Sequence, residues 1–305
     1  MLQITNSTIG KTMTIVPKHF PDGTQMLLDF NPWFLISNSD TVIDITWKYE
    51  AEEELLTLIY VKRHIDNNRN GFKPEINLHM PYIPNARMDR TKHDAEIFTL
   101  KYFCEIINSL NFDKVYVMDA HSNVSVGLLN NCVNRSPVGA ISCAMNRVSR
   151  LVAKDSHRYI YTDLVIYFPD EGACKRYSGH HIFEGHEIIV GRKNRDWNTG
   201  KILGLEICDR NGKELGKDYL HGKTVLMVDD IISYGGTMAY SAEKLRDLGA
   251  NYVYAYATHT ENSIADEDKG TFLKDWRKGI IDKLFTTDSI PHKNTNLFRA
   301  MIEIV

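Results

Sequence analysis

Residues 224–237 read TVLMVDDIISYGGT, the most specific segment of the chain. Its apolar beginning, TVLMVD at 224–229, predicts a strand buried in a sheet. The next segment, 237–248, predicts a helix that ends at Gly249. Strands followed closely by helices build open α/β sheets with parallel strands, and ligands bind at the carboxyl ends of those strands. We therefore expect a binding site at the turn between this strand and this helix.

That turn predicts a sugar phosphate as the ligand. Its two glycines let backbone N–H groups approach an anion, its hydroxyls add donors, and the following helix adds a positive dipole end. Asp229 and Asp230 can accept hydrogen bonds from neighbouring sugar hydroxyls. The alternative is an ordinary glycine turn with an aspartate as helix cap. The expected binding residues are Asp229, Asp230, Ser233, Tyr234, Gly235, Gly236 and Thr237.

Short apolar strands alternate with amphipathic helices along the rest of the chain, which predicts an α/β fold. The apolar and charged fractions, 43% and 25%, are those of globular proteins. Expected strands are 41–46, 75–80, 114–118, 185–190, 224–229 and 252–257, expected helices are 50–66, 94–110 and 237–248, and a hairpin or β-flap is expected within 194–218.

A short repeat indicates two copies of one α/β unit. Residues 115–122 read VYVMDAHS, residues 253–260 read VYAYATHT, and each stretch follows a predicted helix. The first copy has the longer loop between its strand and that helix. Convergence of two buried strands on Val and Tyr is the alternative, since both residues favour strands. With duplication, the chain is expected to form two domains, 1–145 and 146–289.

Composition excludes several classes of protein. The length of 305 residues fits two domains, and a net charge of −3 predicts no nucleic-acid partner. No apolar run approaches the ~18 residues of a membrane span, and the N-terminus lacks a signal peptide's apolar region, so no membrane association is expected. The five cysteines are scattered without a CxxC pair, which disfavours disulfides or structural zinc and predicts a cytoplasmic location.

The segment 224–237 resembles the phosphoribosyl-pyrophosphate (PRPP) motif shared by type I phosphoribosyltransferases and PRPP synthetases. The rest of the chain resembles the synthetases, the ribose-phosphate pyrophosphokinases, through motifs in the family's order. These are FPDGT at 20–24, PYIPNARMDR at 81–90, DAHS at 119–122, PDEGA at 169–173, KNR at 193–195 and TDS at 287–289.

This resemblance implies two tandem phosphoribosyltransferase-like domains, each a mainly parallel sheet flanked by helices, with segment 290–305 joining the first. It implies transfer of the β,γ-pyrophosphoryl group of ATP to the C1 hydroxyl of ribose 5-phosphate, with Mg²⁺ as cofactor. It also implies a homo-oligomer, a dimer or a hexamer of dimer units, because the family completes its ATP pocket with a neighbouring subunit.

The resemblance also assigns roles to residues. Lys193 and Arg195 are implied to be catalytic, and they would project from one side of a flap because residues two apart on a strand share a face. His121 and Asp170 are the implied metal contacts; Mg²⁺ prefers oxygen ligands, so we interpret His121 as touching ATP–Mg²⁺. The implied ATP-binding residues are Phe20, Asp22, Gly23, Thr24, Arg87, Met88, Asp89, Arg90 and His121.

Some positions depart from the family's motifs. Thr24 stands where the family has Glu, Met88 where it has Gln, and Ser233-Tyr234 where it has Asp-Thr. Two alternative functions stay open. A phosphoribosyltransferase that consumes PRPP would share the glycine loop but leave the first-half motifs unexplained. A non-catalytic regulatory subunit of a synthetase would explain Thr24 and Met88, but not the retained Lys193.

Overall fold

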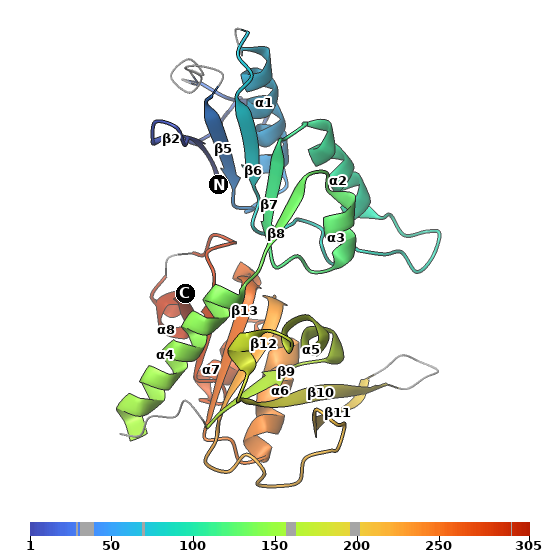
Figure 1. Cartoon of the computed structure of the whole chain (residues 1–305), viewed down its shortest axis with the longest axis vertical. Helices are drawn as coiled ribbons and strands as arrows, with labels where there is room; N and C mark the ends of the chain where they lie inside the picture. The colour runs from blue at the N-terminus through green and yellow to red at the C-terminus, as the bar shows by residue number, and fades with distance from the viewer. Residues whose placement is uncertain (29, 31–39, 69–70, 157–162, 196–201, 294) are drawn as a thin grey trace. The chain divides into compact units, whose positions relative to one another are not determined.

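The computed structural model describes residues 1–28, 30, 40–68, 71–156, 163–195, 202–293 and 295–305. They form two compact units, each with its own sheet (Figure 1). The first unit is Met1–Ser136 with Ser289–Pro291, and the second is Pro137–Asp288 with His292–Val305. No helix within these ranges is long and apolar enough to cross a membrane.

The sheet of the first unit has four parallel strands and an antiparallel edge. Its strand order is β2 (Lys11–Ile15), β1 (Leu2–Asn6), β5 (Val42–Trp47), β6 (Glu75–His79), β7 (Lys114–Met118) and β8 (Cys132–Arg135). β5 to β8 run parallel, and β1 is antiparallel to both of its neighbours. The parallel strands are connected by α1 (Glu53–Asn67), α2 (Thr99–Ser109) and α3 (Asn123–Leu128), and a separate hairpin consists of β3 (Lys18–His19) and β4 (Gln25–Met26).

The core of the first unit lies on one face of this sheet. Side chains alternate between buried and partly exposed along β1 and β5, as expected where one face is covered. Buried residues of α1 and α2 join those of the strands in one apolar cluster. The other face is polar. Nε2–H of the His79 ring donates to the carboxylate of Asp44 (2.8 Å), the ring stacks on Tyr116 (4.6 Å between centroids), and Arg135 lies over Tyr116 (4.5 Å).

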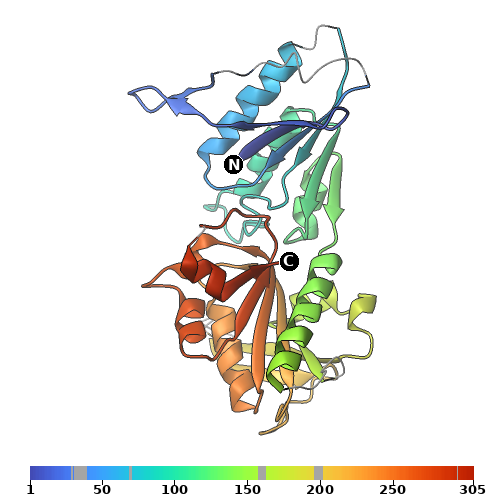
Figure 2. The ribbon, with the colours of Figure 1, turned by 90° about the vertical axis from the view of Figure 1, so that its left-hand side faces the viewer.

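The second unit has a sheet covered by helices on both faces. Its strand order is β11 (Ile202–Asp209), β10 (Glu187–Arg195), β9 (Leu164–Phe168), β12 (Thr224–Ile232), β13 (Tyr252–Thr260), β14 (Lys283–Thr286) and β15 (Ile302–Ile304). All neighbours are parallel except β10 and β11. On one face lie α4 (Val138–Ser156) and α5 (Glu171–Tyr177), and on the other α6 (Gly236–Asp247), α7 (Thr271–Arg277) and α8 (Asn296–Met301) (Figure 2).

Coverage on both faces explains the sequence of the central strands. β9 is buried at every position, and β12 is buried over its first five residues. A strand that packs against helices on both sides has no solvent-facing side, so it is apolar without alternation. The carboxyl end of such a strand is where polar side chains can emerge from the core.

The structure confirms the α/β class and the repeated unit. β6, α2 and β7 in the first unit follow the same order and the same parallel pairing as β12, α6 and β13 in the second. The connection from strand to helix is longer in the first unit, as expected. All the expected strands and helices are present, and β10 with β11 forms the expected antiparallel flap, of which 196–201 lie outside the described residues.

The division between the units differs from the expected boundary at residue 145. α4 begins at Val138, and its buried side chains Ile141 and Met145 pack in the core of the second unit. The helix that connects the two sheets therefore belongs to the second unit, and the first unit ends at Ser136.

The expectation that 290–305 joins the first unit is also corrected. β15 adds to the second sheet through the pairing of Leu284 with Ile302, and Met301 is buried in the same core. Ser289–Pro291 belong to the first unit, and the chain then returns to the second at His292.

A fragment of residues 137–305 should unfold cooperatively in urea, because it keeps every helix and strand of the second sheet. The fragment 146–289 loses the first turns of α4 and all of β15, with the buried side chains Ile141, Met301 and Ile302. Burying one large aliphatic side chain is worth about 1.5–3 kcal/mol. We expect the shorter fragment to lose most of its free energy of unfolding, measured by circular dichroism. Equal stability of the two fragments would contradict this division.

Candidate functional site

The loop after β12 presents backbone N–H groups at the carboxyl edge of the second sheet. Gly235 precedes α6 in the left-handed conformation (φ 84°, ψ 15°), and no side chain in the described ranges caps this helix. N–H groups in the first turn of a helix have no acceptor within the helix. Those of Gly236 and Thr237, which are exposed, can therefore donate to an anion, with the helix dipole in support.

Close packing against α7 requires glycine at position 235. A Cβ atom there would lie 2.4 Å from Cβ of Phe272, at the start of α7. The positive φ adds a second reason, because residues with a side chain rarely adopt it. The loop is therefore held close against α7, and its backbone path is fixed by that contact.

The two carboxylates at the end of β12 have different surroundings. Asp230 is buried, and its Oδ2 lies 2.8 Å from Nη1 of Arg176 on α5. Asp229 lies on the other face of the strand, since successive side chains alternate, and that is the face covered by α6. Oδ1 of Asp229 accepts a hydrogen bond from the N–H of Asp230 (2.9 Å).

Asp229 is the carboxyl with the strongly perturbed pKa. Part of its surface reaches solvent, but the surrounding protein removes enough water that desolvation raises its pKa well above the ordinary value. The negative charges of Asp230 and Asp170 raise it further. A carboxyl in this state gains free energy from any ligand that donates hydrogen bonds to it.

Arg176 is a site residue that the sequence interpretation missed. Its guanidinium comes from α5, the helix that follows β9, and reaches the end of the neighbouring strand β12. The signal available in the sequence was an arginine shortly after the PDEGA motif, in the helix that begins within this motif. Its pairing with Asp230 depends on the order of strands in the sheet, which a local pattern does not show.

Asp170 comes to the same edge of the second sheet. It follows β9, which lies between β10 and β12, and its carboxylate accepts a hydrogen bond from the N–H of Ala173 (3.0 Å). It therefore caps α5 as well as standing beside the end of β12. Carboxyl ends of neighbouring parallel strands meet at one edge, so Asp170 and the two aspartates of β12 belong to one site.

The expected catalytic residues Lys193 and Arg195 lie at the end of β10. Their backbones pair with Leu205 and Ile202 of β11, and the register shifts between Asn194 and Arg195. Their side chains lie outside the described part of the chain, so the expectation that both face one side stays a prediction. The preceding Arg192 joins the flap to α5 through an exposed ion pair with Glu171 (3.1 Å).

The first unit brings together the loop 81–90 and the segment 119–122. They follow the neighbouring strands β6 and β7, and the N–H of Met118 donates to the carbonyl of Pro81 (3.0 Å). Each contains a residue in the left-handed region, Asn85 (φ 61°) and Asp119 (φ 45°). Such conformations are uncommon for residues other than glycine and often occur at binding sites.

The side chains of the expected ATP residues point to solvent from these segments. Arg87, Met88 and Arg90 are exposed, and His121 is partly buried just before α3. The carboxylate of Asp89 lies 3.5 Å from Nε of Arg90 and is only 15% exposed. Two arginines on one exposed loop give a cationic surface that suits a polyphosphate.

The expected nucleotide segment 20–24 forms the turn of the β3–β4 hairpin, which is separate from the six-stranded sheet (Figure 2). Oδ1 of Asp22 accepts hydrogen bonds from the N–H (2.9 Å) and the hydroxyl (2.7 Å) of Thr24, and these bonds lower the pKa of Asp22. Phe20 is 49% exposed. The segment therefore belongs to a hairpin of its own rather than to the loops after β6 and β7.

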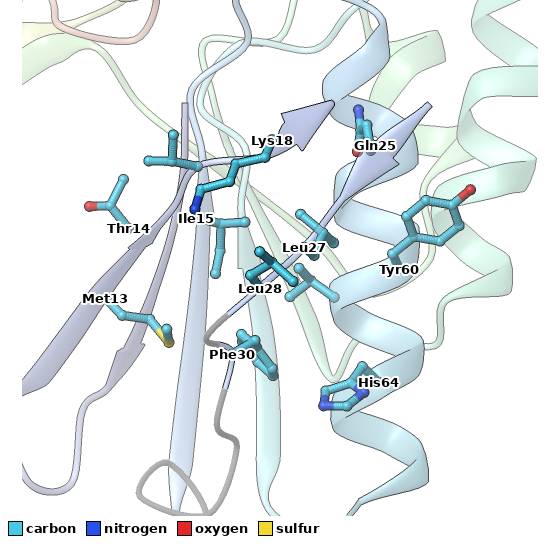
Figure 3. Close-up of a pocket in the computed structure, with 12 residues that line it drawn as sticks. Met13, Thr14, Ile15, Lys18, Gln25, Leu27, Leu28, Phe30, Tyr60 and His64 are labelled. Carbon is cyan, nitrogen blue, oxygen red and sulfur yellow. The ribbon is translucent and has the colours of Figure 1, made fainter. Parts of the chain in front are cut away.

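A cavity of about 710 Å³ lies beside this hairpin, between β2 and α1 (Figure 3). Met13, Leu27 and Phe30 contribute apolar surface, while Lys18 and His64 are polar. None of the expected ATP- or ribose 5-phosphate-binding residues is among those that line it. The cavity is therefore separate from the candidate site.

Together these features describe an α/β protein of two units, in which the central strand of the second sheet ends in two carboxylates and a glycine loop. No model of a known protein family matches the chain. Curated proteins named ribose-phosphate pyrophosphokinase do match. That of Thermococcus kodakarensis is 26% identical over 288 residues, covering 92% of this chain and 88% of the relative. That of Vibrio vulnificus is 26% identical over 261 residues, covering 84% of this chain and 73% of the relative.

A comparison with solved structures finds the same kind of protein by its fold. The phosphoribosylpyrophosphate synthetase of Mycobacterium smegmatis matches with a TM-score of 0.67 at 18% identity, covering 96% of this chain and 85% of that one. This similarity confirms the fold class, an α/β protein whose mainly parallel sheets are flanked by helices. The chain is therefore similar over most of its length to proteins named ribose-phosphate pyrophosphokinase, in agreement with the resemblance that its motifs show.

The substitution Arg176→Met should destabilise the protein, because it leaves the carboxylate of Asp230 buried without its cation. Removing one partner of a buried ion pair costs roughly 3–5 kcal/mol. Arg176 is 28% exposed, so we expect a loss at the lower end of that range. Urea denaturation measures the free energy of unfolding.

The matched control is Arg192→Met. It breaks a pair with Glu171 in which both side chains are exposed, 43% and 56%. Exposed pairs contribute about 0–1 kcal/mol, so this variant should lose less than about 1 kcal/mol. Losses of the same size in both variants would show that burial does not strengthen the Arg176 pair.

Asp229→Asn should stabilise the ligand-free protein at neutral pH. The pKa of Asp229 is raised in the folded state, so the folded protein holds this proton more tightly than an unfolded chain, in which Asp titrates near ~3.9. This tighter proton binding favours the folded state. Its contribution to the free energy of unfolding is complete below pH ~3.9 and is lost as the pH rises through the raised pKa of Asp229. The Tm of the variant should exceed that of the wild type at pH 7.5, and the difference should shrink toward pH 4. A difference independent of pH would contradict the raised pKa.

Proposed function

We propose that this chain is a ribose-phosphate pyrophosphokinase that forms PRPP and AMP from ribose 5-phosphate and ATP. The observation that carries the proposal is the end of β12, where two carboxylates precede a glycine loop and an uncapped helix. Support comes from relatives of that name that match most of the chain. The repeated first unit, with its cationic loop, is what a synthetase needs and a one-domain phosphoribosyltransferase does not.

In this reaction the C1 oxygen of ribose 5-phosphate forms a bond to the β-phosphorus of ATP. The bond from that phosphorus to the oxygen bridging the α- and β-phosphates breaks, and AMP leaves with that oxygen. The proton of the C1 hydroxyl is released. Negative charge gathers on the transferring phosphates, so positioned cations and hydrogen-bond donors supply most of the catalysis.

Ribose 5-phosphate would bind at the end of β12. The N–H groups in the first turn of α6, with the hydroxyls of Ser233 and Thr237, would hold the 5-phosphate. Asp229 and Asp230 would accept hydrogen bonds from the ribose hydroxyls. The ion pair with Arg176 would orient Asp230 for this role, and hydroxyl donors would offset the desolvation that raises the pKa of Asp229.

ATP would bind through the loops of the first unit, and the flap of the second unit would supply the catalytic cations. Arg87 and Arg90, exposed on the loop after β6, would contact its phosphates, with Met88, Asp89 and His121 beside them. Lys193 and Arg195 would close over the transferring group from the end of β10. Cations brought to a polyphosphate in this way stabilise the charge that develops in the transition state.

Asp170 and His121 are the proposed contacts of ATP-bound Mg²⁺. Among the described residues no group of three or more His, Cys, Asp or Glu could hold a metal alone. That fits Mg²⁺, which usually takes one or two protein carboxylates and completes its shell with water and phosphate oxygens. Bound Mg²⁺ would neutralise negative charge on the phosphates. Asp170 has the carboxylate chemistry and lies at the correct edge of the sheet.

We further propose a cytoplasmic homo-oligomer, a dimer or a hexamer of dimer units. The exposed hairpin turn 20–24 supports this, because Phe20 lies at its surface where it could complete the ATP site of a neighbouring subunit. Thr24 is engaged with Asp22 within the same turn, so it would contribute through the shape of that turn.

The test is release of AMP from ATP, which should depend on both ribose 5-phosphate and Mg²⁺ and be matched by equal amounts of PRPP. Chromatography measures all the products. Nucleotide formation from PRPP and a free base, without AMP release from ATP, would show a phosphoribosyltransferase instead. A protein inactive in both assays that changes the rate of a separate synthetase would be a regulatory subunit.

Variants of the flap connect the activity to this site. Lys193→Ala should lower kcat by about 100-fold or more, since it removes a cation from the transition state. Arg210→Ala is the control: Arg210 is an exposed cation just after β11, outside the proposed site, and its loss should leave kcat within about twofold. A normal rate for Lys193→Ala would remove this residue from the mechanism.

A further inference from the structure

The start of α7 is connected to the loop between β12 and α6 by two hydrogen bonds to one carbonyl. We call this loop, residues 233–235, the phosphate loop. The oxygen of Tyr234 accepts from the hydroxyl of Thr271 (2.8 Å) and from the N–H of Phe272 (3.1 Å). Tyr234 is the residue before Gly235, so these bonds fix the peptide group from which the turn into α6 begins. Neither donor belongs to β12, to the loop or to α6.

This connection determines where the next N–H group points. The peptide bonds of the described residues are all trans. In a trans peptide the C=O of one residue and the N–H of the next point in opposite directions. The carbonyl of Tyr234 is directed at α7, so the N–H of Gly235 is directed away from α7.

The position of α7 is itself fixed by close packing. A Cβ at Gly235 would lie 2.4 Å from Phe272, and a Cβ at Gly270 would lie 2.4 Å from the carbonyl oxygen of Asp266. Phe272 and Leu273 are buried in the core of the second unit. The donors on α7 therefore have little freedom to follow the loop if it moves.

We infer that Thr271 is a positioning residue for the phosphate loop, an inference that rests on the proposed function. Its hydroxyl holds the Tyr234 peptide so that the backbone N–H groups from Gly235 to Thr237 stay aimed at the 5-phosphate of ribose 5-phosphate. Thr271 does not touch the substrate. Thr271 holds this peptide group in one orientation before the ligand arrives. Less conformational entropy is then lost on binding, so the affinity for ribose 5-phosphate is higher.

A purely structural role for Thr271 fits the surroundings less well. The side chain is exposed and contributes no surface to the apolar core. The N-cap position of α7 is Gly270, so Thr271 does not cap its own helix. The bond of its hydroxyl goes instead to the loop, and its Oγ1 would lie 3.8 Å from a Cβ at Gly236, the first residue of α6.

The test compares Thr271→Val, which removes the hydroxyl at constant shape, with Thr271→Ser, which keeps it. Loss of one hydrogen bond that orders the loop should raise the KM for ribose 5-phosphate about tenfold. The KM for ATP and kcat should stay within about twofold. Thr271→Ser should have a KM for ribose 5-phosphate within about threefold of the wild type. Isothermal calorimetry with ribose 5-phosphate should show the same changes in Kd.

Thr295→Val is the matched control. The hydroxyl of Thr295 also bonds to the backbone near the start of a helix: Oγ1 of Thr295 accepts from the N–H of Phe298 (3.2 Å). Losing that cap should lower the Tm and leave the KM for ribose 5-phosphate unchanged. A Thr271→Val protein with normal KM, or one whose KM is not restored in Thr271→Ser, would overturn the positioning role.

Failure of the proposed function gives a different pattern. If the wild type binds ribose 5-phosphate in the calorimeter but releases no AMP from ATP, the synthetase activity is wrong and the positioning role is decided by Kd alone. If the wild type releases AMP and Thr271→Val behaves as wild type, only the positioning role is wrong. If the wild type binds no ribose 5-phosphate, both are overturned, because the loop would then lack its ligand.

Discussion

Two adjacent carboxylates end a strand that is buried over its first five residues, and the rest of the site depends on how their charge is accommodated. Alternation along the strand sends one to each face of the sheet. Asp230 meets Arg176 from α5, and Asp229 lies on the side of α6, whose free N–H groups follow the loop. A buried carboxylate without such a partner would be costly, so α5 and the loop are needed for β12 to end as it does.

The two units use the same strand–helix arrangement with different coverage. The first sheet buries one face and exposes a polar row from Asp44 to Arg135, so its strands alternate in sequence. The second sheet is buried on both faces because α4 adds a helical layer opposite α6, α7 and α8. This extra layer is why α4 belongs to the second unit although it directly follows the last strand of the first.

The features that could be predicted from the sequence are those set by neighbouring residues. The strand TVLMVD, the glycine turn and the helix after it are local patterns, and the repeated VYxxxxHS/T stretch revealed the second copy. The boundary could not be predicted in this way, because α4 is amphipathic in either unit and only its tertiary contacts decide where it packs. The same holds for β15, a three-residue edge strand, and for Arg176, whose partner is on another strand.

The loops after β6 and β12 occupy equivalent places in the repeat and differ in how they can bind phosphate. Gly235 and Gly236 let the backbone itself approach an anion, and the contact of Gly235 with Phe272 leaves no room for a side chain there. Residues 81–90 contain no glycine, and exposed Arg87 and Arg90 extend from them. Backbone donors hold one compact phosphate in a fixed place, whereas long side chains can follow a polyphosphate as it reacts. The same order of strand, helix and strand thus carries two loops whose donors differ, backbone N–H groups in one and arginine side chains in the other.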